Sequence, residues 1–318
     1  MYSWRIGIRW AQLALFRHSI FQVDEHLEFK NYNNNISFQT VAVFGWNNAI
    51  SLVCGNTTLW KPAPTTSLCA VAVTKILEKV FKNNDLPASL CTLVSGDADI
   101  GKAIANDKRL PLVSFTGSCQ IGREVGVAVQ QRFGKHILEL GGNNAIIVDH
   151  DADIDMVIRA SLFACVGTAG QRCTTTRRLF VHENIHDKIV ERLSDVYGRV
   201  RVGDPLDTDT LYGPLHSEQA VNNYEKTIKA AIESGGKIIC GGKRMNRPGL
   251  YVEPTIITGL SHDSTMVHTE TFAPIVYIIP FKQLNDAIAW NNEVEQGLSS
   301  SIFTSNLNSI FKVNIYFI

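Results

Sequence analysis

The chain has 318 residues, 45% of them hydrophobic and 19% charged, which is enough for two globular domains and excludes a disordered chain. Thirty basic residues balance thirty acidic ones without a long run of either sign, so the charge excludes the cationic surface that nucleic acids or anionic membranes require. No apolar stretch approaches the roughly 20 residues of a membrane span. We therefore expect a soluble protein with a small-molecule ligand, and neither a nucleic-acid nor a membrane partner.

The first 40 residues carry no functional motif. Four asparagines within residues 31–35 predict a loop or a disordered join. Residues 1–22 hold three arginines and no acid, a composition with a faint resemblance to a mitochondrial presequence. Because this resemblance is weak, the expected location is cytoplasmic, with a mitochondrial one left open.

Residues 57–140 alternate between strand and helix patterns, which predicts a parallel, Rossmann-like sheet with a dinucleotide at the carboxyl ends of its strands. The expected strands are 57–61, 89–94, 112–115 and 136–140, and the expected helices are 67–81, 99–106 and 120–133. Thr116, Gly117 and Ser118 lie where a strand stops and a helix opens, so we place the phosphate site there. Ordinary helix capping by Ser118 is the alternative.

The next stretch combines a carboxylate with a thiol. Glu139 lies in an apolar strand, and Cys173 follows a glycine-punctuated turn in a segment that also carries the cations Arg172, Arg177 and Arg178. A thiolate is a strong nucleophile, and a carboxylate in apolar surroundings has a raised pKa and can act as a base near neutral pH. A buried structural Cys beside a capping Glu is the alternative. The polar, cationic flanks favour covalent catalysis.

The rest of the chain predicts a second α/β unit. Asp151, Asp153 and Asp155 are interpreted as helix N-terminal charge, because the glycine and distant Glu of a calcium loop are missing. The expected helices are 154–166 and 185–197, and the expected strands are 178–181, a short one between two glycine pairs at 235–242, and 275–280. The seven cysteines form no CxxC pair or Cys/His cluster, so we expect thiols in a reducing compartment and no metal.

Two motifs carry a family resemblance. LELGGNNA around Glu139 and GTAGQRCTTTRR around Cys173, 173 − 139 = 34 residues apart, resemble the signature motifs of the NAD(P)-dependent aldehyde dehydrogenase superfamily. WNNAI at 46–50, WKPAPTTSL at 60–68 and TETFAPI at 269–275 most resemble its antiquitin branch, whose substrate is α-aminoadipic semialdehyde. The likeness covers about residues 41–312 and implies an incomplete aldehyde dehydrogenase fold. We expect an unmatched segment at 1–40, a partial NAD-binding domain at 41–140 and a partial catalytic domain at 141–318.

The resemblance also implies residue roles. Cys173 attacks an aldehyde and Glu139 drives hydrolysis of the resulting thioester, with Cys173 N–H as an oxyanion donor. Lys61 and Gly96 serve the adenosine side of the cofactor, Glu270 the nicotinamide ribose, Phe272 the nicotinamide ring, and Trp46 and Arg172 the substrate. From the residues alone, Lys61 is a solvated charge, Arg172 a surface charge, and Glu270 with Phe272 a polar loop with a core aromatic. NAD is expected and NADP stays open, since Pro64 stands where many relatives have a ribose-binding Glu.

One departure from the family bears on activity. Phe38 stands where the family has a catalytic Asn that donates to the oxyanion, and loss of one such donor typically slows a reaction about a hundred- to a thousandfold. The family assembles as homo-tetramers, which we do not expect of a chain truncated at both ends. Two alternatives follow: a catalytically impaired pseudoenzyme that keeps the fold and binds nucleotide, and a thiol hydrolase or transferase, for which no histidine motif is present.

Overall fold

The computed structural model describes residues 19–24 and 34–316. The chain divides into two compact units, Met1–Leu140 and Gly141–Ile318. Each unit has its own parallel or mostly parallel sheet and its own hydrophobic core. Within the described residues, none of the helices combines the length and the apolar composition that crossing a bilayer requires.

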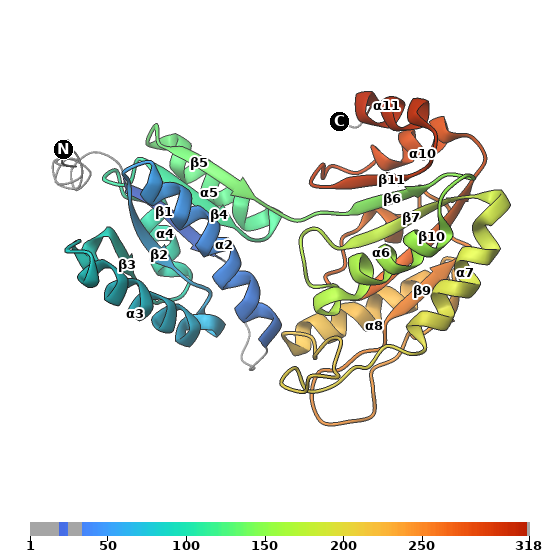
Figure 1. Cartoon of the computed structure of the whole chain (residues 1–318), viewed down its shortest axis with the longest axis horizontal. Coiled ribbons are helices and arrows are strands. Elements are labelled where there is room, and N and C mark those ends of the chain that lie inside the picture. Colours follow the sequence, from blue (N-terminus) through green and yellow to red (C-terminus); the bar gives the residue numbers. More distant parts are fainter. Residues whose placement is uncertain (1–18, 25–33, 317–318) are drawn as a thin grey trace, which may run out of the picture. The chain divides into compact units, whose positions relative to one another are not determined.

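Among the described residues, the sheet of the first unit consists of five parallel strands in the order β3-β2-β1-β4-β5 (Figure 1). The first strand lies in the middle, and the later strands add outward on both sides, as in doubly wound dinucleotide-binding folds. This order confirms the predicted Rossmann-like class. The strands are β1 Ser19–Asp24, β2 Thr57–Lys61, β3 Cys91–Leu93, β4 Leu112–Thr116 and β5 Lys135–Glu139.

The described residues of the first unit form the helices α2 Asn34–Val53, α3 Ser67–Asn83, α4 Ala98–Asn106 and α5 Cys119–Gln131, with short 3-10 turns at Pro64–Thr66 and Ala88–Leu90. The start of α5 shows why the local sequence folds this way. Ser118 Oγ accepts a hydrogen bond from the amide of Ile121 at 3.3 Å, which is an N-cap. Gly122 lets the helix approach the sheet, since a Cβ there would lie 2.3 Å from Leu140 Cδ2.

The N-terminal part differs from the prediction. Asn34 and Asn35 open α2 instead of forming a loop, and residues 31–33 of the predicted join lie outside the described residues. Short polar side chains favour helix starts as well as turns, so the asparagine run was ambiguous. The central strand β1 was not predicted, because its place between β2 and β4 is set by pairing with distant segments.

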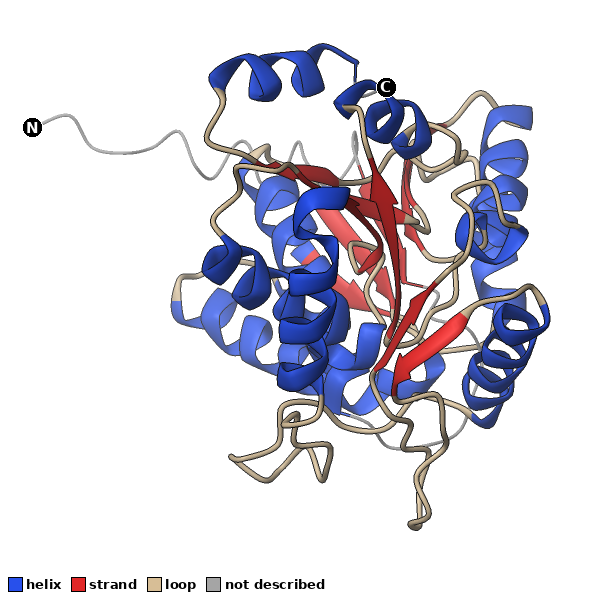
Figure 2. Cartoon of the chain, turned by 90° about the vertical axis from the view of Figure 1, so that its right-hand side faces the viewer, coloured by secondary structure: helices blue, strands red, loops and turns tan. Residues whose placement is uncertain are grey.

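The second unit has a six-stranded sheet in the order β11-β6-β7-β10-β9-β8, parallel except for the antiparallel pair β8 and β9. In Figure 2 the strands of this sheet run through the middle of the unit with helices on either side. Helices α6 and α7 pack on β7 and β10, whereas α10 packs on β6 and β10. The strands are β6 Asn144–Val148, β7 Thr176–His182, β8 Lys237–Cys240, β9 Thr255–Thr258, β10 Ile275–Phe281 and β11 Ser300–Phe303.

The helices of this unit are α6 Ile154–Val166, α7 Glu183–Tyr197, α8 Glu218–Glu233, α9 Thr265–His268, α10 Leu284–Asn291 and α11 Leu307–Tyr316. Helix α6 has the predicted bounds, and Asp153 caps it by accepting from the Met156 amide at 3.1 Å. Asp155 lies in its first turn and pairs with Arg192 at 2.6 Å, which confirms the interpretation as helix-terminal charge.

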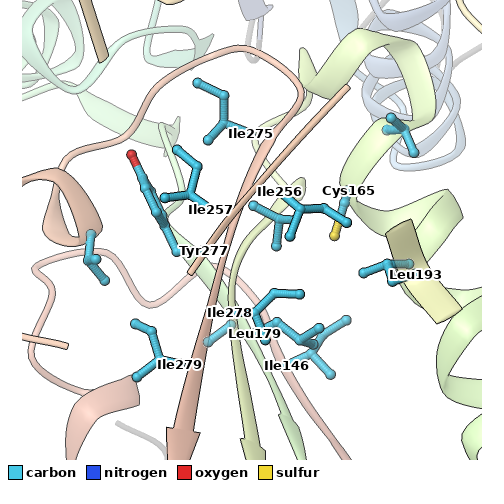
Figure 3. Packing of buried hydrophobic residues seen from close by; sticks show 14 of the residues in the cluster. Ile146, Cys165, Leu179, Leu193, Ile256, Ile257, Ile275, Tyr277, Ile278 and Ile279 are labelled. Carbon is cyan, nitrogen blue, oxygen red and sulfur yellow. The ribbon is translucent and has the colours of Figure 1, made fainter. Parts of the chain in front are cut away.

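The core of the second unit forms where isoleucine-rich strands meet the helices. Figure 3 shows Ile256 and Ile278 from the sheet facing Cys165 of α6 and Leu193 of α7. Full burial of such a side chain stabilises the folded state by roughly 1.5–3 kcal/mol. The packed sheet therefore gives the segments that lead into and out of it a rigid base.

Candidate active site

The predicted cofactor residues of the first unit and the predicted base Glu139 lie at the carboxyl ends of the strands of its sheet. Lys61 ends β2, Thr116 ends β4 and Glu139 ends β5, and Thr116 is the Cα partner of Glu139. Gly96 follows β3, and Gly117 follows β4. Because carboxyl ends of parallel strands lie at the same edge, the fold brings all of these positions together there.

The turn from β4 into α5 fits an anionic group. Among the described residues, the buried Thr116 Oγ1 has no hydrogen-bond partner. The first amide groups of α5, at Cys119 and Gln120, are those that a helix leaves without an internal acceptor. Gly117 contributes differently from the prediction, since its amide donates to Glu139 O at 3.0 Å. The capping role of Ser118 and a phosphate site at this helix start are compatible.

Lys61 is buried, with 1% of its surface exposed, so the alternative of a solvated charge is wrong. Its Nζ lies 3.4 Å from the carbonyl oxygen of Pro62. The preceding Trp60 stacks on Phe44 of α2 with 3.7 Å between ring centroids, which fixes the end of the strand. An ammonium group held at the carboxyl ends of the strands is suited to contact a polar ligand there.

Glu139 and Trp46 of the first unit are more exposed than predicted. Glu139 was expected to be a buried base, and Trp46 was expected to line the substrate site. Glu139 is half-buried because β5 is an edge strand, where the neighbouring Ile137 is 46% exposed. The prediction of a buried carboxylate is therefore wrong for this unit. Trp46 lies on α2 and is 53% exposed. Phe38 lies in the same helix, and its side chain is outside the described residues.

Cys173 follows a left-handed turn in the second unit. Helix α6 ends at Val166, and Thr168, Ala169 and Gly170 then have φ of 56°, 55° and 68°. A Cβ at Gly170 would lie 2.4 Å from the backbone of Ala273, so the turn is pressed against the segment that enters β10. Cys173 itself is half-buried. The glycine signal in the sequence thus marks both a positive φ and a close backbone approach.

Asn144 and Gly142, which follow Glu139 in the sequence, hold the backbone of Cys173. Asn144 Nδ2 donates to Cys173 O at 2.7 Å and to Thr175 O at 2.8 Å, while Asn144 Oδ1 accepts from the amide of Ser299 at 3.1 Å. Gly142 lies beneath the same carbonyl, and a Cβ there would be 2.3 Å from Cys173 O. Sequence reasoning missed Asn144. Its signal was the asparagine pair after the glycines, at the start of a strand.

Glu270 and Phe272 lie beside this loop. Glu270 Oε1 accepts from the Gly142 amide at 3.1 Å and from Arg177 Nη2 at 3.3 Å. The Arg177 guanidinium also lies over the Phe272 ring, 5.4 Å from its centroid. The structure therefore brings three predicted site residues, Cys173, Glu270 and Phe272, into one region of the second unit.

Arg172 is half-buried rather than fully solvated. Its Nη2 donates to Phe163 O at 3.0 Å, and its guanidinium lies 4.5 Å from the centroid of the Phe163 ring. Burial lowers the pKa of Arg172, and the neighbouring Cys173 thiolate acts in the opposite direction. In this position Arg172 packs on α6, directly beside the nucleophile in sequence.

A second polar cluster lies at the carboxyl ends of β6 and β7. The potential ligand atoms of Asp149, His150 and His182 are all within 4.8 Å of one another. Asp149 Oδ1 bonds to His150 Nδ1 at 2.9 Å, which raises the pKa of His150. No sequence motif indicated this cluster, because His182 is remote in the chain. Asp151 is bonded elsewhere, accepting from Thr304.

The chain has extensive similarity to proteins of known sequence. It is 59% identical over 272 residues to the α-aminoadipic semialdehyde dehydrogenase of Bos taurus, covering 86% of this chain and 50% of the relative. A putative aldehyde dehydrogenase family 7 member A1 homolog of Caenorhabditis elegans is 58% identical over 273 residues, covering 85% of this chain and 51% of the relative. The chain thus spans about half the length of the curated relatives it matches.

Solved structures also resemble the chain, at lower sequence identity. The lactaldehyde dehydrogenase of Escherichia coli superimposes with a TM-score of 0.86 at 29% identity, over 94% of this chain and 60% of the other. The betaine aldehyde dehydrogenase of Staphylococcus aureus, in complex with NAD+, superimposes with a TM-score of 0.85 at 28% identity, over 94% of this chain and 58% of the other. Residues 39–315 match the aldehyde dehydrogenase family as a whole. Since this match takes in most of the sequence, the chain belongs to the aldehyde dehydrogenase family.

Proposed function

We propose that the chain carries the nucleophile and the general base of an NAD-dependent oxidation of α-aminoadipic semialdehyde to its carboxylic acid. The observation that carries the proposal is the anchoring of the Cys173 loop. Asn144 fixes the carbonyl of Cys173, and Gly142 links that point to Glu270 through its amide. A half-buried thiol on a fixed backbone, beside a carboxylate able to bind a ribose, is suited to covalent catalysis next to a nucleotide.

In the proposed mechanism, Cys173 Sγ attacks the aldehyde carbon and forms a thiohemiacetal. Its oxyanion faces the Cys173 amide, which donates a hydrogen bond to it. The chemistry that NAD supplies when bound is acceptance of hydride, after which Cys173 carries a thioester. Glu139 then takes a proton from the water that attacks the thioester carbon. The carbon–sulfur bond breaks, which releases the carboxylic acid and restores the thiol.

The residues of the first unit fit the cofactor. Thr116 Oγ1 and the first amides of α5 offer donors for a pyrophosphate, and the buried Lys61 ends a strand at the same edge. In the second unit, Glu270 would accept from the nicotinamide ribose, and Phe272 would lie against the ring. The NAD+ complex of the bacterial relative supports a nicotinamide dinucleotide. Direct titration of NAD against NADP decides between the two.

The substrate proposal rests on the names of the relatives and on Arg172. A guanidinium beside the nucleophile can bind the remote carboxylate of a semialdehyde in a two-pronged contact. For this, Arg172 Nη2 must leave the Phe163 carbonyl, which it contacts at 3.0 Å. Trp46 is proposed as an apolar wall for the aliphatic part of the substrate.

The test is to incubate the purified chain with α-aminoadipic semialdehyde and NAD, and to follow both reduced cofactor and the mass of the Cys173 peptide. We expect an acyl adduct on Cys173 that decays to acid, and neither signal from a Cys173→Ser control. Turnover by that control would refute the assignment of the nucleophile. Phe38 favours a second outcome, in which NAD binds but turnover is weak or absent, as in a pseudoenzyme.

A further inference from the structure

Arg177, the second residue of β7, has a fully buried guanidinium at the centre of the Cys173 region. Only 1% of its surface is exposed. Its hydrogen bonds to the described residues go to backbone carbonyls and to one carboxylate oxygen. The acceptors, within 2.6–3.4 Å, are Gly142 O, Gly170 O, Arg172 O, Thr271 O, Ala273 O and Glu270 Oε1.

These acceptors come from three separate segments. Gly142 precedes β6, Arg172 is next to Cys173, and Glu270 precedes β10. A planar guanidinium has five N–H donors in a fixed fork, so one side chain can hold three segments at set angles. Without it, several buried carbonyls would lose their donors at once.

The electrostatic position of Arg177 is unusual. Burial lowers the pKa of its guanidinium, and the Glu270 carboxylate at 3.3 Å acts against this shift, as does the Cys173 thiolate. A desolvated charge is unfavourable unless it is paired, which makes Glu270 an essential partner. Both hydrogen bonds that the described residues give to Glu270 end on Oε1, so Oε2 is the oxygen left for a ribose hydroxyl.

We propose that Arg177 is a positioning residue that holds the Glu270 carboxylate and the Cys173 loop in one fixed arrangement, so that cofactor binding and nucleophile placement depend on the same side chain. The inference rests on the proposed function and deepens it. Arg177 need not touch substrate or cofactor. It acts through the carbonyl of Arg172 and through Glu270.

Arg178 provides a matched control, because it is equally buried at 1% exposure. Its guanidinium donates to Asn143 O, Trp290 O and Asn291 O at 2.8–3.0 Å, and burial lowers its pKa to about 10. The last two carbonyls belong to the end of α10, and none of the three belongs to the Cys173 turn or the Glu270 segment. A lysine at either position keeps the positive charge but lacks the forked set of N–H donors of a guanidinium.

The first measurement is NAD affinity by titration calorimetry for the full chain, Arg177→Lys and Arg178→Lys, with melting temperatures for each. Loss of a hydrogen bond to a charged group should weaken NAD binding by about tenfold to a hundredfold in Arg177→Lys. Arg178→Lys should lower the melting temperature similarly but leave the NAD dissociation constant nearly unchanged. In an Arg177→Lys/Glu270→Gln double variant, the losses should be less than additive.

The second measurement needs no cofactor and no turnover. The rate of Cys173 alkylation by iodoacetamide is followed against pH by peptide mass spectrometry. Arg177→Gln removes a positive charge and should move the profile to higher pH, whereas Glu270→Gln removes a negative charge and should move it to lower pH. Arg177→Lys keeps the charge and should shift the profile least.

A purely structural Arg177 would give a different pattern. Equal effects of Arg177→Lys and Arg178→Lys on NAD affinity, with both glutamine variants shifting the alkylation profile in the same direction, would overturn the proposal. If the parent chain binds no NAD, the proposed function fails, and the opposite alkylation shifts alone decide the role of Arg177.

Discussion

Gly142→Ala is expected to displace the nucleophile without unfolding the chain. A Cβ at position 142 would lie 2.3 Å from the carbonyl oxygen of Cys173. Ordinary contact begins at 3.4 Å, so the methyl group and the oxygen must move apart by the difference, 1.1 Å. The oxygen cannot retreat freely, because Asn144 Nδ2 holds it at 2.7 Å.

Two magnitudes follow from this shift. Insertion of a methyl group into a packed site lowers the free energy of unfolding by about 1–3 kcal/mol, and each kcal/mol lowers Tm by about 2–4 °C in a unit of this size. A displacement of about 1 Å at a reacting group slows the reaction by about 10²-fold. We therefore expect a folded variant with a modestly lower Tm and an acylation rate reduced about a hundredfold.

The assay is the burst of nitrophenolate from 4-nitrophenyl acetate, which reports acylation of Cys173 without a hydride acceptor. Gly198→Ala is the matched control in the same unit, because φ there is −62° and the atom nearest to an added Cβ would be 3.6 Å away. Equal burst rates in the two variants would refute the claim that the Gly142 contact places the nucleophile.

Three other outcomes are expected. Limiting iodoacetamide should label Cys173 before the exposed Cys54 and before Cys165, whose pKa is raised by burial to about 12. If peptide mass spectrometry showed Cys54 or Cys165 to be labelled first, Cys173 would not be the nucleophile. Glu139→Gln should slow deacylation of the thioester more than its formation, and an unchanged deacylation rate in rapid-quench experiments contradicts the role of base. Arg172→Ala should raise KM for α-aminoadipic semialdehyde about tenfold or more while sparing benzaldehyde, and equal losses on both would end the anchor hypothesis.

Elements with strong local signals were predictable from the sequence. Helix α6 has the predicted bounds because Asp153 caps its start and a glycine follows its end. Strand β2 has the predicted bounds as well, as a short run with β-branched and aromatic residues between Gly55-Asn56 and Pro62. The left-handed turn before Cys173 was visible as glycine punctuation, although the positive φ of Thr168 and Ala169 was not.

Contacts between distant segments could not be predicted. Arg177 and Arg178 were interpreted as cations that make the Cys173 segment polar, yet both are buried among backbone carbonyls up to 113 residues away in sequence. Glu139 was predicted to be buried because its strand is apolar, but exposure depends on β5 being at the sheet edge. Both outcomes depend on tertiary neighbours, which composition and periodicity do not encode.

The left-handed turn at Thr168 and Ala169 lowers the stability of the fold but fixes the position of the Cys173 thiol. Each non-glycine residue in this conformation costs roughly 1–2 kcal/mol, and a β-branched threonine is a clear outlier there. Glycine at position 169 would relieve part of that strain and also free the backbone that delivers the thiol. Selection for thermal stability alone would therefore favour a looser turn, and the alanine is best understood as the residue that keeps the loop stiff at the expense of the fold.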